Sequence, residues 1–469
     1  MAIILHLDVN SYYATMEQQA YPSLRGKPIG VAGKGRGERT VMVGASIEAK
    51  KLGVRGIMPT WEAKKLCPQI IIVPANYDRY IFTSKRIFAL LERFSPKVEI
   101  FSIDEAFLEL PTPESSKLEA RNTKQVLNFI NSNFEIVSDL GFRISDFCQP
   151  KNLPYLYAIK TAIQIKQLIK SHIGSWVSVS VGISYGRTLA KLASELEKPD
   201  GLVVIRPENF AKIAAQTPIE ELCGIGWALQ PRLNQMGIKT IAELGAMPLE
   251  MLVTAFGPHT GSWLHRIGNG IDDGQLRSFR ELPQEKSVGH SYTLPRDITN
   301  PEDAKRSMLL LAERVAVRLR RKGLLARGVN VYIRFGDKTG FGQHLLTKTY
   351  TADGYQLYQW AQKLLEAVPQ GKPIRLIAIS AYELVKHVEH SRSLFLDDHH
   401  HEKLLGALDK INNRYGEFAV HRAALSRVKQ RIFKLPDGRN KGLYTPELES
   451  DQTTLRRRSI STSPFLKRL

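Results

Sequence analysis

The sequence is poor in cysteine and has no long hydrophobic run. Its three cysteines, Cys67, Cys148 and Cys223, stand far apart in a chain of 469 residues. An odd, scattered set argues against a disulfide framework, and the lack of any CxxC pair argues against a structural zinc site. No apolar window reaches about eighteen residues, so we expect no membrane-spanning segment. A reducing compartment follows from these absences, and we expect a cytoplasmic protein.

Acidic residues are also scarce relative to basic ones. The chain has 66 Lys and Arg against 46 Asp and Glu, which gives a net charge of +20. Such an excess favours a polyanionic partner, either nucleic acid or an anionic membrane surface. The first residues, Met1–Leu5, carry no basic region and no cleavage site, so they predict a strand and not a signal peptide.

Three carboxylates stand out because they interrupt apolar segments. Asp104 and Glu105 are adjacent in one largely apolar stretch, Val98–Leu108. Asp8 lies in a second, Ile3–Val9. Buried charge is costly unless it is paired or bound to metal, and oxygen ligands of this kind suit Mg²⁺. The pattern therefore predicts a hard-cation site on two core strands.

Pattern and composition divide the chain into three blocks and a tail. Strands and amphipathic helices alternate over 1–207, except for an insertion at 112–157, after which a helix is expected from Ala158. Helices with Gly-rich turns are expected over 208–275, a linker over 276–286, and the order β-α-β-β-α-β over 287–386. One helix near 402–415 and a basic, partly disordered tail are expected within 387–469. These patterns predict a multi-domain α/β (α+β) protein.

Several motifs, taken in order along the chain, resemble those of the Y-family (DinB/UmuC-type) translesion DNA polymerases. They are Leu7–Ala14, Glu48–Val54, Ser102–Phe107, Val181–Ser184, Leu189–Ser194 and Lys198–Gly201. The resemblance implies a right-hand polymerase: a palm over 1–207 with fingers at about 20–75, a helical thumb, and a C-terminal βαββαβ little-finger domain. Asp8–Asn10 and Ser95–Ile100 look closer to UmuC, so the motifs leave the branch open.

By this resemblance the protein would be a DNA-directed DNA polymerase that performs low-fidelity translesion synthesis on primer–template DNA. Asp8, Asp104 and Glu105 match the metal-binding carboxylates, and the backbone carbonyl of Val9 would be a further ligand. They would hold two Mg²⁺ ions, one to activate the primer hydroxyl and one to hold the triphosphate of the incoming dNTP.

The resemblance also assigns nucleotide contacts. Tyr13 falls at the steric-gate position, where an aromatic ring would clash with a ribose 2′-hydroxyl. Tyr12, Lys50 and Lys198 would complete the nucleotide site, with Lys198 matching a triphosphate-contacting lysine. Ile47 and Lys50 stand where related enzymes often carry a Tyr and an Arg, so Lys50 can supply charge but not a bidentate contact.

Other motifs point to DNA and to a protein partner. The turn Gly224-Ile225-Gly226 resembles a helix-hairpin-helix, which would hold phosphates without reading sequence. Arg334, which is expected to point outward from the strand 329–335, would strengthen this DNA binding. Leu394 and Phe395 resemble the core of a sliding-clamp-binding peptide, although the usual leading Gln is missing. A monomer that binds a clamp is the resulting expectation.

Two other interpretations remain open. A palm-domain nucleotidyl cyclase would share the paired carboxylates but would not need the thumb turn or the basic third block. A catalytically inert DNA-binding or clamp-binding homologue would not need the intact set Asp8, Asp104 and Glu105. Primer extension separates both from a polymerase.

Overall fold

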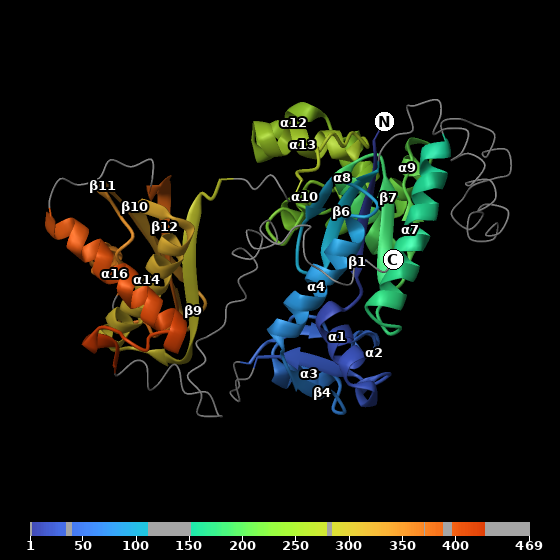
Figure 1. Cartoon of the computed structure of the whole chain (residues 1–469). Helices are drawn as coiled ribbons and strands as arrows, with labels where there is room; N and C mark the ends of the chain where they lie inside the picture. The colour runs from blue at the N-terminus through green and yellow to red at the C-terminus, as the bar shows by residue number, and fades with distance from the viewer. Residues whose placement is uncertain are drawn as a thin grey trace. The chain divides into compact units, whose positions relative to one another are not determined.

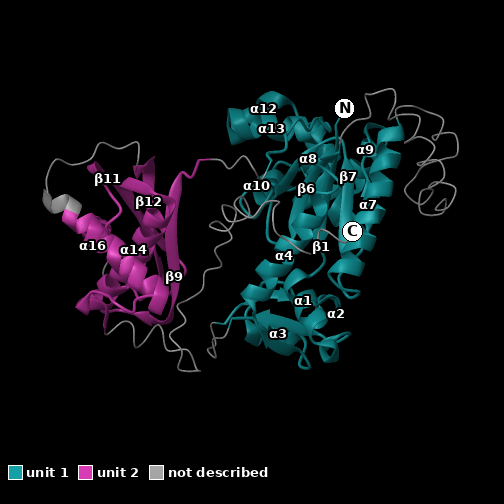
Figure 2. Cartoon of the chain, in the orientation of Figure 1, with its two compact units in different colours: residues 1–282, 455–469 teal, residues 283–454 magenta. Residues whose placement is uncertain are grey.

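A computed structural model describes residues 2–33, 40–110, 152–278, 284–369, 371–387 and 396–426. The chain forms two compact units, which meet in sequence between Leu282 and Pro283 (Figures 1 and 2). Most of the predicted insertion, the clamp-like residues Leu394 and Phe395, and the end of the basic tail lie outside the described residues.

A five-stranded sheet with the order β5-β6-β1-β7-β8 is the centre of the first unit. Its strands are β5 (Val98–Ile100), β6 (Glu105–Leu110), β1 (Ile3–Val9), β7 (Val179–Ser184) and β8 (Leu202–Val204). β1 is buried along its whole length and pairs antiparallel with both β6 and β7. This central place explains why its sequence is an almost continuous apolar run.

Helices cover both faces of this sheet. Leu5 and Leu7 share a hydrophobic core with helices α4 (Tyr77–Leu91) and α7 (Leu153–His172). The opposite face packs against helix α8 (Arg187–Leu196). A Cβ on Gly182 of β7 would lie 2.1 Å from the carbonyl oxygen of Ala190, so this close helix–strand contact requires glycine.

Coverage of both faces also buries the serines of β7. Every residue of this strand is buried, although serine and glycine alternate with apolar residues along it. Its serines are satisfied inside the core: Ser184 donates to the carbonyl of Ile205 at 3.0 Å, and Ser180 accepts from Asn10 at 2.9 Å. Buried hydroxyls are tolerated when they are paired in this way.

A smaller sheet with the order β3-β2-β4 builds the region expected to be the fingers. It contains β2 (Ile29–Ala32), β3 (Met42–Ala45) and β4 (Ile71–Pro74), with helices α1 (Tyr12–Ala20), α2 (Ile47–Lys51), α3 (Thr60–Leu66) and the 3₁₀ turn η1 (Pro22–Leu24). It has a small hydrophobic core of its own, which includes Met42, Val54 and Met58.

The starts of two helices have clear local causes, and one of them lies earlier than predicted. α4 begins at Tyr77 because the Asn76 side chain caps it by accepting from the backbone N–H of Arg79 at 3.2 Å. α7 begins at Leu153 and not at Ala158. Pro154 is compatible with a first helical turn, and the buried Tyr155 anchors that turn to the core.

The end of the first unit is helical. It comprises α9 (Pro207–Gln216), the 3₁₀ turn η4 (Ile219–Glu221), α10 (Gln230–Gln235), α11 (Ile241–Ala246), α12 (Leu249–Phe256) and α13 (Pro258–Gly268). The turn at Gly224 follows α9 and η4 and is followed by α10, in line with the helices and Gly-rich turns predicted over 208–275. A tighter helix pair, α12 and α13, is joined by Gly257 at φ +83°, a conformation that favours glycine.

The second unit has the predicted order β-α-β-β-α-β. Its elements are β9 (Ser287–Ile298), α14 (Pro301–Lys322), β10 (Leu324–Phe335), β11 (Gly340–Thr351), α15 (Gly354–Leu365) and β12 (Ile374–Lys386). The sheet order is β11-β10-β12-β9, so β12 lies between the two strands that α14 connects, as in a split βαβ unit. Val329, Val331 and Ile333 of β10 are buried and Arg334 is exposed, as the alternation predicts.

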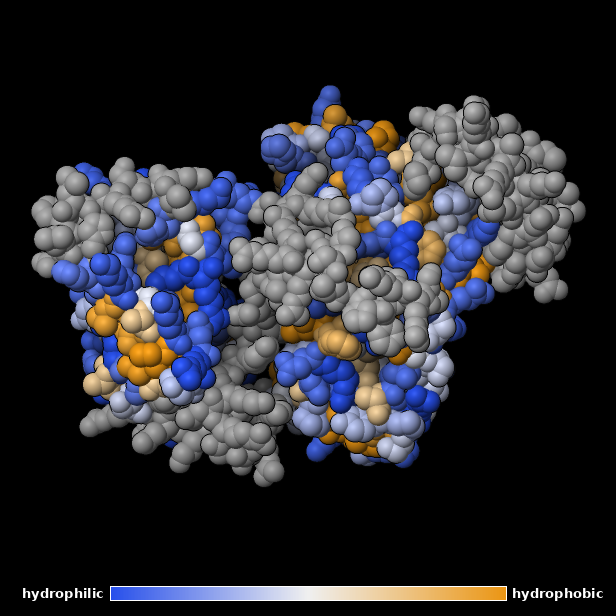
Figure 3. Space-filling model, viewed as in Figure 1, coloured by the Kyte–Doolittle hydropathy of each residue, from blue (hydrophilic) through white to orange (hydrophobic). Residues whose placement is uncertain are grey.

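The segment after the clamp-like residues also packs on this unit. Helix α16 (Leu396–Tyr415) and the 3₁₀ turn η6 (Ala423–Leu425) lie against α14. Arg320 pairs with both carboxylate oxygens of Asp409 at 2.7 Å, and Arg314 pairs with Glu417 at 2.8 and 3.0 Å. The second unit therefore extends past residue 386 to at least residue 426. An apolar patch amid hydrophilic surface is visible on it in Figure 3.

Candidate active site

The pairing of β1 with β6 brings two of the predicted carboxylates together. Asp8 and Glu105 are direct cross-strand partners in the antiparallel register. Asp104 immediately precedes β6, and its carbonyl accepts from the backbone N–H of Val9 at 3.0 Å. Residues far apart in the sequence are thus fixed by rigid strands, which hold side chains more precisely than loops do.

The structure adds a third carboxylate that the sequence analysis did not single out. Carboxylate oxygens of Asp8, Glu105 and Glu195 all lie within 4.8 Å of one another, and this is the one such group among the described residues. Glu195 comes from the end of α8. It lies between the motifs Leu189–Ser194 and Lys198–Gly201 in the sequence, but only the contact of α8 with the sheet brings it to Asp8.

Asp104 lies beside this group and not within it. Its carboxylate accepts from the Ser102 hydroxyl at 2.5 Å, and its backbone N–H donates to the same hydroxyl at 3.3 Å. Burial raises the pKa of Asp104, Ser102 opposes that shift, and the negative charge of Glu105 adds to it. The side chain is therefore held near Glu105 by its own turn.

The carboxylates repel one another in a site of low polarity. Burial, with the nearby carboxyl of Glu105, raises the pKa of Asp8 to about 7, although the ammonium of Lys198 opposes this. Groups that are costly to ionise when crowded and buried are relieved by a cation. The donor set is all carboxylate oxygen, which fits a hard divalent ion.

Two lysines partly neutralise these carboxylates. Lys198 Nζ lies 3.0 Å from Asp8 and 2.8 Å from Glu195. Lys191 Nζ lies 2.8 Å from Glu105 and 3.9 Å from Glu195. Burial alone would lower the pKa of Lys198, but the negative charges of Asp8 and Glu195 outweigh burial and raise the pKa above its usual value. Lys198 therefore stays protonated at neutral pH. The charges of Lys198 and Asp8 also act on Lys50: burial and Lys198 lower the pKa of Lys50, and Asp8 opposes this.

Asn10 supports the turn that presents Lys198. Its Oδ1 accepts from the backbone N–H of Asp200 at 2.9 Å, and its Nδ2 donates to Ser180 at 2.9 Å. Asp200 is also paired with Lys166, at 2.9 Å. Asn10 is nearly fully buried, so a single amide ties the start of α1 to the end of the lysine turn.

Tyr12 and Tyr13 open α1, and their side chains have different surroundings. Tyr12 is 2% exposed and donates from its hydroxyl to the Tyr80 carbonyl at 2.5 Å, so its ring belongs to the core. Tyr13 is half-buried, with its ring centroid 5.1 Å from that of Tyr80. A Cβ on Gly44 would lie 3.2 Å from the Tyr13 ring, so glycine gives this ring room. Of the two rings, Tyr13 is the one that can face a ligand.

The residues predicted to contact DNA belong to other elements of the two units. Gly224 has φ +108°, and a Cβ there would lie 2.8 Å from the Trp263 ring, so the turn requires glycine. Ile225 is 4% exposed, which leaves only its backbone available to a ligand. Arg334 is exposed on β10 of the second unit, where its guanidinium carbon lies 5.9 Å from the Tyr332 ring centroid.

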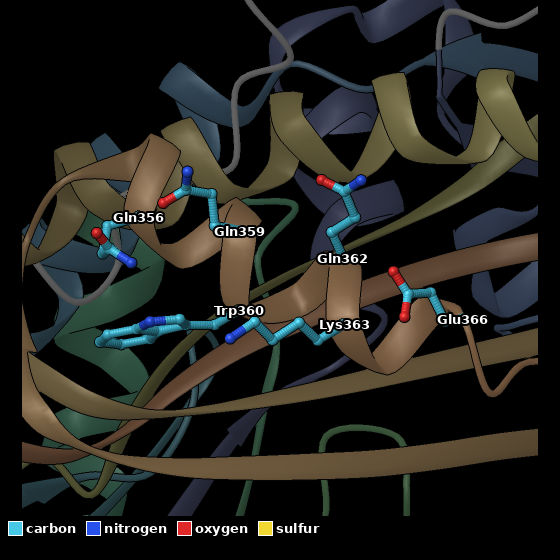
Figure 4. Close-up of a pocket in the computed structure, with 6 residues that line it drawn as sticks. All are labelled: Gln356, Gln359, Trp360, Gln362, Lys363 and Glu366. Carbon is cyan, nitrogen blue, oxygen red and sulfur yellow. The ribbon is translucent and has the colours of Figure 1, made fainter.

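A cavity of about 370 Å³ in the second unit does not compete with this site. It runs along helix α15 and is lined by Gln356, Gln359, Trp360, Gln362, Lys363 and Glu366. Figure 4 shows Gln359 and Gln362 on one side of the helix and Trp360 and Lys363 on the other. The polar groups do not converge, so the cavity offers no centre for chemistry.

The fold of the chain is that of the right-hand polymerases. A solved Y-family DNA polymerase chimera has the same fold, with a TM-score of 0.64, 23% identity, and coverage of 82% of this chain and 99% of that chain.

Family models and relatives define the class further. Residues 7–195 match the impB/mucB/samB family, 220–272 match "DNA polymerase-iota, thumb domain", and 285–394 match the impB/mucB/samB C-terminal domain. DNA polymerase IV of Moorella thermoacetica is 33% identical over 422 residues, covering 90% of this chain and 95% of that protein. DNA polymerase IV of Pelotomaculum thermopropionicum is 32% identical over 421 residues, covering 90% and 94%.

The chain therefore belongs to the impB/mucB/samB family of Y-family DNA polymerases, in its DinB-type branch. This confirms the resemblance found in the sequence motifs and selects the branch that those motifs left open. None of the described helices is long and apolar enough to cross a membrane.

Proposed function

We propose that the protein is a DNA-directed DNA polymerase that extends a primer past damaged template positions with low fidelity. The observation that carries the proposal is the cross-strand pair of Asp8 and Glu105, with Asp104 beside it and Lys198 in contact with Asp8. Membership of the family and the polymerase names of its relatives support the same activity.

In this reaction the primer 3′-oxygen forms a bond to the α-phosphorus of a dNTP while the bond to pyrophosphate breaks. Asp8, Asp104 and Glu105, with the carbonyl of Val9, would hold two Mg²⁺ ions, which would activate the primer hydroxyl and neutralise the phosphates. Lys198 would exchange its carboxylate partners for triphosphate oxygens, and Lys50 would add charge nearby. Most of the rate enhancement would come from positioning and charge neutralisation.

Tyr13 would act as the steric gate. Its ring is packed against Tyr80 and has room from Gly44, so it is held on one side and half-exposed on the other. A ring fixed in this way cannot move aside for a ribose 2′-hydroxyl, whereas a deoxyribose would pack on it. Tyr12 would contribute only through its backbone, because its side chain belongs to the core.

DNA would be held by sequence-independent contacts. The turn Gly224-Ile225-Gly226 would offer backbone N–H groups to phosphates, and Arg334 would add charge from the second unit. The net charge of +20 suits a polyanionic partner. We further propose that the protein acts as a cytoplasmic monomer and that Leu394 and Phe395 bind a sliding clamp. Loss of clamp binding on Leu394→Ala with Phe395→Ala would test the last point.

The direct test is primer extension with Mg²⁺ on undamaged and abasic templates. The unmodified chain should add dNTPs in a distributive manner, and Glu105→Gln should lose at least about a hundredfold in rate. The matched control is Glu109→Gln on the same strand, since Glu109 pairs with Lys97 and not with the site. No extension by the unmodified chain, with DNA still bound, would instead favour the inert homologue.

A further inference from the structure

A buried histidine lies directly behind the carboxylate site. His6 is on β1, two residues before Asp8, so both side chains leave the strand on the same face. Its side chain is completely buried, and its ring lies 4.5 Å from that of Phe107, centroid to centroid. Histidine is an unusual choice for the centre of an otherwise apolar strand, and a polar ring there needs partners.

Only one of the two ring nitrogens has a partner. Nδ1 lies 2.7 Å from the hydroxyl of Ser194 on α8. Nε2 has no hydrogen-bond partner among the described residues, although it is fully enclosed. The carboxylate oxygen Oε2 of Glu105 lies 4.0 Å from this nitrogen. Leaving a buried nitrogen unpaired is costly, so the direction in which it points is informative.

Glu105 is therefore approached from two sides. Lys191 Nζ contacts Oε1 at 2.8 Å, and His6 Nε2 faces Oε2. Ser194 contacts both residues: its hydroxyl lies 2.7 Å from His6 Nδ1 and donates to the backbone carbonyl of Lys191 at 2.8 Å. One helix face thus connects both groups that border the Glu105 carboxylate.

We infer that His6 is a positioning residue for Glu105, with Nε2–H directed at Oε2 and Nδ1 accepting from Ser194. The other tautomer would aim a bare nitrogen lone pair at a carboxylate oxygen, which is electrostatically unfavourable. Ser194 has one hydroxyl proton, so in this tautomer the hydroxyl donates to Nδ1 and gives up its hydrogen bond to the Lys191 carbonyl. In the other tautomer it donates to that carbonyl and accepts from Nδ1–H, so Glu105 selects between two arrangements that Ser194 can adopt by rotation.

A neutral donor suits this position. Burial, with the charges of Lys191, Lys198 and Arg187, keeps the pKa of His6 well below its usual value, so the ring is uncharged at neutral pH. It can orient Glu105 without neutralising it, whereas Lys191 contributes a full charge. The inference rests on the proposed function, in which Glu105 holds a divalent cation; outer partners of this kind orient metal-binding carboxylates.

Two substitutions separate the two ring nitrogens. In His6→Gln the side-chain amide nitrogen takes roughly the place of Nε2, and in His6→Asn it takes roughly the place of Nδ1. The readout is Mn²⁺ binding by the full chain, followed by electron paramagnetic resonance of free Mn²⁺, with Glu105→Gln as the baseline. His265→Gln, on α13 of the thumb, is the control for a histidine change away from the site.

We expect His6→Asn to weaken Mn²⁺ binding roughly tenfold and His6→Gln to keep it near that of the unmodified chain. Ser194→Ala should weaken it less than His6→Asn does. Equal Mn²⁺ affinities for the unmodified chain, His6→Asn and Ser194→Ala would overturn the inference. If His6→Asn does not fold, as judged by its thermal unfolding, an unchanged Ser194→Ala would overturn it alone.

Failure of the proposed function would look different. If the unmodified chain binds Mn²⁺ no better than Glu105→Gln and extends no primer, the polymerase proposal fails and His6 loses its role with it. If the unmodified chain binds Mn²⁺ and extends primers while the His6 variants match it, only the inference about His6 fails.

Discussion

The sheets of the two units use the same backbone geometry in opposite ways. β1 is buried along its whole length because helices cover both faces of its sheet. β11 in the second unit is exposed at most positions, and only one face of that sheet packs against α14 and α15. A charge on the first sheet is therefore in a medium of low polarity, where electrostatic interactions are strong. A charge on the second remains in water.

In the proposed function, this difference separates catalysis on the first sheet from DNA binding on the second. The first sheet concentrates carboxylates whose ionisation is costly, as the raised pKa of Asp8 shows. The open face of the second sheet has a shallow depression of about 250 Å³ lined largely by small or polar residues, among them Gly289, Ser291, Asn330 and Ser380. Small side chains let a bulky, hydrated partner approach the strands. Substitutions in both units test the comparison, from the largest expected effect to the smallest.

Replacing the proposed gate should change the choice of sugar. Tyr13→Ala removes the ring held against Tyr80, so discrimination against ribonucleotides should fall by roughly a hundredfold, while dNTP addition continues. Single-nucleotide insertion with matched dNTP and NTP measures the ratio. Tyr13→Phe keeps the ring and should keep the discrimination; a loss of equal size in Tyr13→Phe would contradict the steric account.

The second unit should lose stability in mild acid because of His290. Burial, with Arg314 and Arg318, lowers the His290 pKa from 6.5 to about 4. The unfolded chain then binds a proton that the folded chain resists, so stability falls as pH drops from about 6.5 to 4. The loss is at most about 3 kcal/mol. Denaturant unfolding of the full chain at pH 7 and pH 5 should show a smaller loss in His290→Gln; the same loss in both proteins would sink this explanation.

Most secondary structure and much of the candidate site could be predicted from the sequence, because periodicity and short motifs are local signals. The alternation of β10 and the carboxylates Asp8 and Glu105 are of this kind. Glu195, His6 and Asn10 could not be placed in the site from pattern alone. Their roles depend on how α8 and the turn at Asp200 pack on β1, which is tertiary information.

The same reason explains the errors. Helix α7 was expected from Ala158 but begins at Leu153, because the buried Tyr155 anchors an additional first turn to the core. The helix expected near 402–415 is present as α16, but its packing on the second unit was not predicted, because the ion pair that fixes it joins Arg320 and Asp409, which are far apart in the sequence. Composition cannot reveal such long-range pairs.

Loosening the lysine turn should weaken nucleotide binding without affecting DNA binding. Asn10→Ala leaves the backbone N–H of Asp200 and the Ser180 hydroxyl without their amide partner, so KM for dNTP should rise roughly tenfold. Steady-state insertion kinetics measures this. Ser178→Ala removes only a donor to Asn10 and serves as the control. An unchanged KM for Asn10→Ala would show that the amide does not position Lys198.

Removing one exposed charge from the second sheet should have the smallest effect. Arg334→Ala should weaken DNA binding a few-fold and reduce by about one the slope of log affinity against log salt. Fluorescence anisotropy over a salt series measures both. Arg334→Lys retains the charge and should retain the slope; a full loss of slope in Arg334→Lys would point to a specific guanidinium contact instead.

The proposed division between catalysis and DNA binding is tested most directly by measuring DNA affinity and single-turnover extension together for Glu105→Gln and Arg334→Ala. The account predicts that Glu105→Gln binds DNA like the unmodified chain but extends at least about a hundredfold more slowly. Arg334→Ala should bind DNA more weakly and, once saturated with DNA, extend at the unmodified rate. Slow extension by DNA-saturated Arg334→Ala, or full-rate extension by Glu105→Gln, would contradict it.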